Sequence, residues 1–211
     1  MLIKVGTVLI AALMALSGLA TLTVNSGLAL LGGQKNNTGS TITSVDCFPG
    51  NTAFLNPSAN AADTGGSGNG FELNPTNAYT DGSDFASNAN GPGDRHRYYN
   101  YNTSIKSSCA INGIQVRLDW WLGSIAGTSS MSAELSWNGG ASWTAAKTDS
   151  QESTSEHTVV LGGPSDTWGR TWSVSELSNA NFRVRLTSNS STSQRDFYLD
   201  WVPVSVYYGP P

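Results

Sequence analysis

The side chains that enzymes most often use for catalysis are sparse in this sequence. It holds two histidines, His96 and His157, and two cysteines among 211 residues. A zinc site built from histidine and cysteine needs more ligands than this. The HExxH, CxxC, GxSxG and Walker patterns are all missing, and the Gly-rich stretch 66–70 is interpreted as a loop. We therefore expect a protein that is not an enzyme.

Two carboxylates have the only arrangement that would suit hydrolysis. Asp119 and Glu134 are predicted on the outward faces of two strands that could be neighbours. A pair of carboxylates can cleave a glycosidic bond. Outward carboxylates in strands are usually solvated surface groups, and we favour that interpretation.

A second set of carboxylates could bind a metal ion. The turn Asp81-Gly82-Ser83-Asp84 offers two of them, and Asp200 could supply a third. Calcium takes such oxygen ligands, so a structural Ca²⁺ is the one cofactor that we consider. The alternative is an ordinary polar turn.

Aromatic side chains could stack on sugar rings. The candidates are Trp121, Tyr98, Tyr99 and Tyr101. Most tryptophans of this chain occupy inward positions of the predicted strands, so packing in the core is the default interpretation for aromatic residues here.

Three sequons could accept N-linked glycans, at Asn36, Asn102 and Asn189. Asn56 and Asn74 are excluded because proline follows each of them.

The composition points to strands and turns on an uncharged surface. Charged residues make up 12% of the chain, and Gly, Ser, Thr and Asn are abundant. The formal net charge is −4, and no basic stripe is present. Nucleic acid is therefore excluded as a partner, because its binding needs concentrated Lys and Arg.

Alternating apolar residues predict several strands after residue 110. Inward positions are expected at Ile114, Val116, Leu118, Trp120, Met131, Ala133, Leu135, Phe182, Val184 and Leu186. Further strands are expected at 157–161 and from Phe197 onward, with a bulge or an edge position at Pro203. Asn138-Gly139 predicts a hairpin turn that leads into a strand containing Trp143.

Residues 45–100 are rich in Asn, Gly, Ser and Pro, which predicts short strands between long loops. No stretch after residue 35 has helical periodicity. The fold class is therefore mainly β, with a single antiparallel β-sandwich head of jelly-roll or Ig-like type over 45–211.

Cys47 and Cys109 are expected to form one disulfide in an exported protein.

The N-terminus predicts a long hydrophobic α-helix over 1–33, followed by a polar hinge at 34–44. From Val5 to Val24 no residue is charged, and twenty helical residues span about 30 Å, the thickness of a bilayer core. The segment could be a cleaved signal peptide, a membrane anchor, or the assembly helix of a filament subunit. The apolar side chains of that helix would be Val5, Val8, Leu9, Ile10, Leu13, Leu16, Leu19 and Leu22.

The N-terminal sequence resembles archaellins and related type IV pilin-like subunits. The matching features are the segments Gly6-Thr7-Val8-Leu9-Ile10, Val24-Asn25-Ser26-Gly27-Leu28 and Gln34-Lys35. The resemblance implies a precursor inserted in the membrane, which then polymerises with copies of itself into an extracellular filament. Archaellins are commonly glycosylated, so the resemblance also implies glycans on the head.

The head, over roughly 77–208, resembles a domain of exported bacterial surface proteins. Its segments LSWNGGASWTAAKT and RDFYLDWVPVSVYY carry this likeness. The step Leu199-Asp200-Trp201-Val202 is similar to the closing strand of jelly-roll carbohydrate-binding modules.

Two functions are therefore predicted from the sequence. The first is the structural subunit of a cell-surface filament, archaellum-like or pilus-like, for motility or adhesion. The alternative is a secreted or membrane-anchored jelly-roll module that binds glycans.

Overall fold

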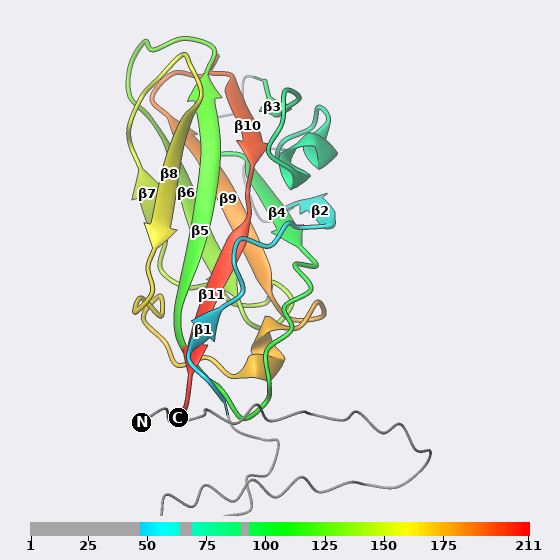
Figure 1. The fold of residues 1–211 in the computed structure, drawn as a ribbon. Coiled ribbons are helices and arrows are strands. Elements are labelled where there is room, and N and C mark those ends of the chain that lie inside the picture. Colours follow the sequence, from blue (N-terminus) through cyan, green and yellow to red (C-terminus); the bar gives the residue numbers. More distant parts are fainter. Residues whose placement is uncertain (1–46, 64–68, 90–92) are drawn as a thin grey trace, which may run out of the picture. The chain divides into compact units, whose positions relative to one another are not determined.

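The computed structural model describes residues 47–63, 69–89 and 93–211 (Figure 1). All of them belong to a unit that spans Ser44–Pro211. The predicted helix over 1–33, the hinge at 34–44 and the sequon at Asn36 lie outside the described residues. Within the described part, no helix is long and apolar enough to cross a membrane.

Two antiparallel sheets form the unit, so the prediction of a mainly β, sandwich-like fold is confirmed (Figure 1). The first, sheet A, contains β1 (Gly50–Asn51), β3 (Ala86–Asn88), β5 (Ala110–Leu122), β8 (His157–Gly162), β10 (Phe197–Trp201) and β11 (Val204–Gly209). The second, sheet B, contains β2 (Ala59–Ala62), β4 (Arg95–Tyr99), β6 (Ser129–Ser136), β7 (Lys147–Asp149) and β9 (Arg183–Ser190). Two short 3₁₀ helices, η1 (Pro75–Tyr79) and η2 (Val174–Leu177), lie in the connections.

The 13-residue strand β5 is the centre of sheet A. Strand β8 pairs with one of its edges, while β10 and β11 follow one another along the other edge. The break between β10 and β11 falls at Val202 and Pro203. Proline has no N–H to give to a ladder, and the sequence places it where the apolar alternation changes phase.

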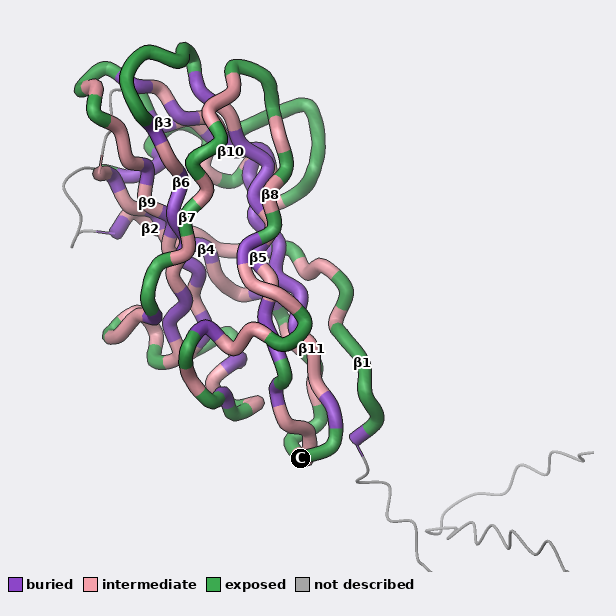
Figure 2. The backbone as a smooth tube through the Cα atoms, turned by 90° about the vertical axis from the view of Figure 1, so that its left-hand side faces the viewer, coloured by how far each residue is buried: buried purple, intermediate pink, exposed green. Residues whose placement is uncertain are grey.

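The core lies between the two sheets and follows the predicted alternation. Ile114, Val116, Leu118 and Trp120 of β5 are fully buried, and so are the inward residues of β6 and β9. Figure 2 shows that buried positions recur along the strands of both sheets. Burying this apolar surface stabilises the sandwich by about 25 cal/mol per Å², and that gain fixes which face of each strand is turned inward.

The connection between β6 and β7 differs from the prediction. Gly139 adopts a positive φ of 73°, but so does Gly140, at 100°, and β7 begins only at Lys147. The side-chain oxygen of Asn138 accepts a 2.8 Å hydrogen bond from the Ser142 N–H and a 3.2 Å hydrogen bond from the Ser136 hydroxyl. This local bonding stabilises a longer loop in place of a two-residue turn, so Trp143 lies in the loop and not in a strand.

The expected disulfide is present. Cys47 and Cys109 are joined across 62 residues of sequence, and this bond ties the segment before β1 to the segment before β5.

Candidate functional site

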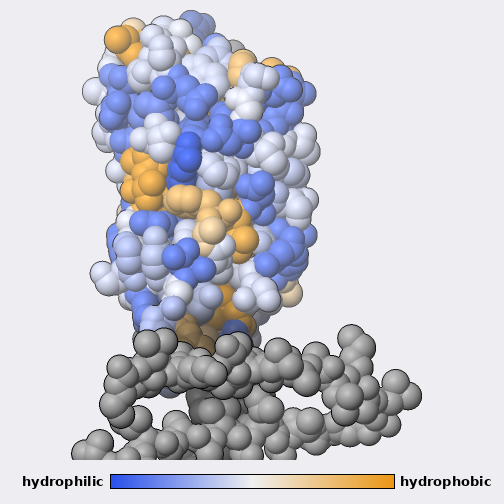
Figure 3. Space-filling model, viewed as in Figure 1, coloured by the Kyte–Doolittle hydropathy of each residue, from blue (hydrophilic) through white to orange (hydrophobic). Residues whose placement is uncertain are grey.

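The outer face of sheet A carries a row of polar and aromatic side chains. On β5, Arg117, Asp119 and Trp121 alternate with the buried Leu118 and Trp120 and so share the opposite face. Residues two apart in a strand are about 7 Å apart. Figure 3, viewed as in Figure 1, shows a mainly hydrophilic surface crossed by an apolar band. Val160 of β8 is the ladder partner of Arg117 and is 42% exposed.

Three aromatic rings lie together at one end of this row. Tyr198 of β10 is paired across the ladder with Trp121, and their ring centroids are 5.4 Å apart. Phe85, just before β3, meets both rings edge-on at 5.0 and 5.1 Å. Phe85 is 39% exposed, and Trp121 and Tyr198 are half-buried. This aromatic cluster is therefore stabilised by contacts among its own rings and still reaches the surface.

Arg117 and Asp119 form the charged centre of the row. Asp119 is fully buried, and its two oxygens lie 2.9 Å from Nε and 2.7 Å from Nη2 of Arg117. The Thr158 hydroxyl donates a 2.6 Å hydrogen bond to the same carboxylate. The guanidinium also lies 4.5 Å from the ring centroid of Trp201. A buried carboxylate needs such pairing.

A bulge in β10 brings a second carboxylate beside the first. Trp201, and not Asp200, is the Cα partner of Asp119, because the register shifts between Leu199 and Trp201. Asp200 is the extra residue of the bulge, and a bulge changes the direction of the side chain at that position. Asp200 is 1% exposed, and its Oδ2 accepts a 3.1 Å hydrogen bond from the Gly82 N–H.

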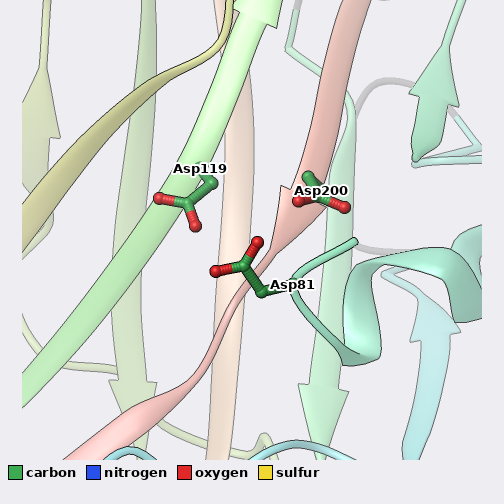
Figure 4. A group of neighbouring side chains, drawn as sticks. All are labelled: Asp81, Asp119 and Asp200. Carbon is green, nitrogen blue, oxygen red and sulfur yellow. The ribbon is translucent and has the colours of Figure 1, made fainter. Parts of the chain in front are cut away.

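Asp81 completes a carboxylate cluster made of Asp81, Asp119 and Asp200. One oxygen of each lies within 4.8 Å of the others, and Figure 4 shows the three groups converging from the loop after η1, from β5 and from β10. Asp81 is also 3.6 Å from Nη2 of Arg117.

Burial and the carboxylates of this region shift the pKa values of Asp200 and Glu156. Burial raises the pKa of Asp200, and the neighbouring Asp81 and Asp119 raise it further, although the Gly82 N–H opposes this. Burial and the same three carboxylates also raise the pKa of Glu156. The negative charge of this region therefore exceeds what Arg117 neutralises.

The predicted metal ligands are only partly brought together. Asp81 and Asp200 belong to the carboxylate cluster, whereas Asp84 is exposed and outside it. The third member, Asp119, was predicted as a surface group and as a partner of Glu134. That pairing is wrong, because β5 and β6 belong to different sheets. Glu134 forms an ion pair with Arg185, 2.8 Å away.

Of the four predicted sugar-stacking residues, two are unable to reach a ligand. Tyr98 is fully buried and Tyr101 is 2% exposed, because both extend into the core. Tyr99 is half-buried on sheet B, with the Arg183 guanidinium 4.3 Å from its ring centroid. Trp121 alone among the four is part of the aromatic cluster.

Both histidines have structural contacts. His96 is 3% exposed between the Phe71 N–H and Asn60. Nε2 of His157 lies 2.8 Å from Asp149, which also accepts a 2.9 Å hydrogen bond from the indole of Trp120.

The two described sequons lie in different settings. Asn102 is exposed, has a positive φ of 54°, and accepts a 2.7 Å hydrogen bond from Asn179. Asn189 lies within β9, where its amide donates to the Ser132 hydroxyl at 3.2 Å.

Asn189 also borders a hydroxyl-rich hollow of about 470 Å³, formed near the start of β6 and the end of β9. Its lining residues are Thr128, Ser129, Ser130, Ser150, Glu152, Asn189, Ser190 and Ser191. Glu152 is the one ionisable residue there, and its Oε1 is a buried atom with no hydrogen-bond partner among the described residues.

Sequence reasoning missed Phe85, Tyr198 and Arg117 as parts of the site. Tyr198 could have been found, because it alternates with the inward Phe197 and Leu199. Phe85 carries no such signal, since it lies outside a periodic segment.

Comparison with known proteins gives remote structural likeness only. No protein-family model matches the chain, and no curated protein matches it in sequence. Solved structures that it resembles include a CBM32 of AlyQ in complex with 4,5-unsaturated mannuronic acid, at 15% identity and a TM-score of 0.41, covering 72% of this chain and 96% of that one. Two others are CBM35 from Cellvibrio japonicus Abf62 (14%, TM-score 0.36, 74% and 92% covered) and TmCBM61 in complex with β-1,4-galactotriose (6%, TM-score 0.37, 69% and 86% covered).

Proposed function

We propose that the β-sandwich is an extracellular glycan-binding module, with its sugar site on the outer face of sheet A around Trp121. The observation that carries this proposal is the aromatic cluster of Phe85, Trp121 and Tyr198 on the same face as Arg117 and the carboxylate cluster.

The chemistry of a sugar matches this combination of groups. A pyranose ring has faces of C–H groups, which pack on an aromatic ring, and a rim of hydroxyls, which both donate and accept hydrogen bonds. Binding sites of this kind combine apolar and aromatic surface with a few polar groups that fix orientation. Here carboxylate oxygens of Asp81 would accept from hydroxyls, and the guanidinium of Arg117 would donate to them.

A neutral glycan fits better than an anionic one. When no cation is bound, the excess of carboxylates over guanidinium on this face repels sulfated or uronic sugars, and the whole chain has a net charge of −4.

A protein partner fits less well. Five large apolar side chains are exposed among the described residues, namely Phe48, Leu73, Phe85, Ile125 and Val160. Protein interfaces are built around a larger core of apolar and aromatic anchors. The disulfide supports an oxidising, extracellular setting.

The test is a binding screen of the full-length chain, held in detergent, against immobilised neutral and acidic polysaccharides. The Trp121→Ala variant should lose roughly 5- to 150-fold in affinity, because stacking on one ring is worth about 1–3 kcal/mol by analogy with bases on aromatic platforms. Trp143→Ala is the matched control, since Trp143 is a half-buried tryptophan beside Arg185 of sheet B.

Retained binding in Trp121→Ala would contradict this assignment of the site. Loss of binding in Glu152→Gln alone would move the site to the hydroxyl-rich hollow. A chain that binds no polysaccharide in either class would rule out the proposed function.

The filament hypothesis rests on residues 1–33 and therefore stays a sequence-based prediction. It is compatible with a glycan-binding head, because an assembled subunit would display the head outward. Electron microscopy of material sheared from cells tests it: filaments that react with an antibody to the head support it, and their lack would count against it.

A further inference from the structure

The carboxylate cluster of Asp81, Asp119 and Asp200 has a geometry that an ordinary acidic surface does not have. Its members come from three separate segments of the chain, and their oxygens converge to within 4.8 Å of one another (Figure 4). Two of the three side chains are buried, with 0% and 1% exposure for Asp119 and Asp200. Burying two carboxylates side by side costs free energy unless positive charge compensates them.

Arg117 compensates only part of that charge. It forms two close contacts with Asp119 and a longer one, at 3.6 Å, with Asp81. Among the described residues, no salt bridge involves Asp200.

Asp200 supplies a second, independent observation. Its Oδ2 accepts the hydrogen bond from Gly82, but its Oδ1 is a buried atom with no hydrogen-bond partner among the described residues. Such an atom is costly to leave unmatched. Figure 4 shows the Asp200 carboxylate beside Asp81, with an oxygen directed into the space between the three groups.

We propose that these three carboxylates bind a calcium ion. Hard oxygen donors without histidine or cysteine select Ca²⁺ or Mg²⁺ over zinc or copper. Calcium is favoured over magnesium because it accepts irregular geometry, whereas magnesium demands a near-ideal octahedron. Asp81 is on an exposed loop, with 54% of its side chain accessible, so water can complete the coordination.

The ion would tie the loop after η1 to β5 and β10. That loop leads to Phe85, so the bound ion would also help to hold Phe85 of the aromatic cluster in position. The cation site is independent of the glycan proposal, because its test uses Ca²⁺ alone.

The experiment compares thermal unfolding of the full-length chain in detergent, in EDTA and in Ca²⁺, with terbium luminescence sensitised by tryptophan as a second readout. At Ca²⁺ roughly 100 times above its Kd, the Tm of the wild type should rise by about 5 °C or more. The rise should be much smaller in Mg²⁺, and Ca²⁺ should displace bound terbium.

Three variants make the test specific. Asp81→Asn and Asp200→Asn should each weaken Ca²⁺ binding at least tenfold, whereas Asp84→Asn, in the same loop but outside the cluster, should bind as the wild type does. Asp200→Asn should also be more stable than the wild type in EDTA, because it removes a buried like charge, and less stable in saturating Ca²⁺.

This reversal of order separates ion binding from a change in folding. A wild-type Tm that is equal in EDTA and Ca²⁺, without terbium luminescence that Ca²⁺ displaces, would overturn the proposal. Equal affinities of wild type, Asp81→Asn and Asp200→Asn would overturn it as well.

Discussion

Acid should destabilise the sandwich through His96. The Phe71 N–H can only donate, so Nδ1 of His96 accepts that 3.2 Å hydrogen bond, and the ring proton sits on Nε2, 2.9 Å from the side-chain oxygen of Asn60. Protonation of Nδ1 would break this arrangement in a site that is 3% exposed. Burial, and secondarily the charge of Arg97, lower the pKa of His96 from 6.5 to about 4.

The sign of the effect follows from proton binding. Between pH 6.5 and about 4 the unfolded chain holds the proton and the folded chain does not, so the free energy of unfolding falls as the pH falls through this window. At 1.36 kcal/mol per pH unit the full loss is about 3 kcal/mol, of which about 2 kcal/mol is reached at pH 5. Above pH 6.5 this contribution is fully present.

The assay is urea unfolding of the wild type and of His96→Gln at pH 7 and pH 5. Glutamine keeps one donor and one acceptor but does not titrate, so the wild type should lose about 2 kcal/mol more than the variant does. Imidazole NMR gives a direct check, because the chain has only two histidines and the variant assigns His96. A His96 midpoint near or above pH 6 would show that burial does not lower the pKa of His96 in this way.

Three further predictions concern stability. Replacing Arg117 by Met should lower the free energy of unfolding in urea by about 3 kcal/mol, because the buried carboxylate of Asp119 loses its charged partner. Adding Asp119→Asn to the same chain should recover part of this loss. A double variant whose loss equals the sum of the two single losses would contradict this. Gly162→Ala should be far more destabilising than Gly169→Ala in thermal unfolding. Both glycines have positive φ, at 83° and 76°. A Cβ added at Gly162 would clash with the Ile114 carbonyl oxygen, whereas a Cβ added at Gly169 would have no atom within 4 Å. The conformational cost alone is about 1 kcal/mol, so equal losses would show that the clash is relieved. Reduction of the disulfide should lower the free energy of unfolding by about 4 kcal/mol for its 62-residue separation, and an unchanged urea midpoint would disagree with that estimate.

Strand positions were predictable wherever one face is apolar. The alternation from Ile114 to Trp120 fixes both the strand and its inward side, because a shift by one residue would expose the whole set. The same reasoning located β8, β9 and the break at Pro203.

Pairing between distant strands was not predictable in the same way. Periodicity places Asp119 and Glu134 on the outer faces of their strands but does not reveal that β5 and β6 belong to different sheets. The prediction of a two-residue turn between β6 and β7 was wrong for a local reason. The side chain of Asn138 accepts a hydrogen bond within the loop, and this stabilises a longer connection.

The candidate site depends on features that periodicity does not carry. A one-residue bulge in β10 brings Asp200 beside Asp119, and a non-periodic loop brings Phe85 over Trp121. Tyr98 and Tyr101 were selected as aromatic residues in a polar segment, but both are buried in the core.

Hydrogen–deuterium exchange of the full-length chain, with and without a neutral oligosaccharide, would locate the sugar site on the fold. We expect slower exchange at β5, β10 and the segment around Phe85, with no change at β6, β7 or β9. Protection confined to the strands of sheet B, or to the hydroxyl-rich hollow, would contradict a sugar site on the outer face of sheet A.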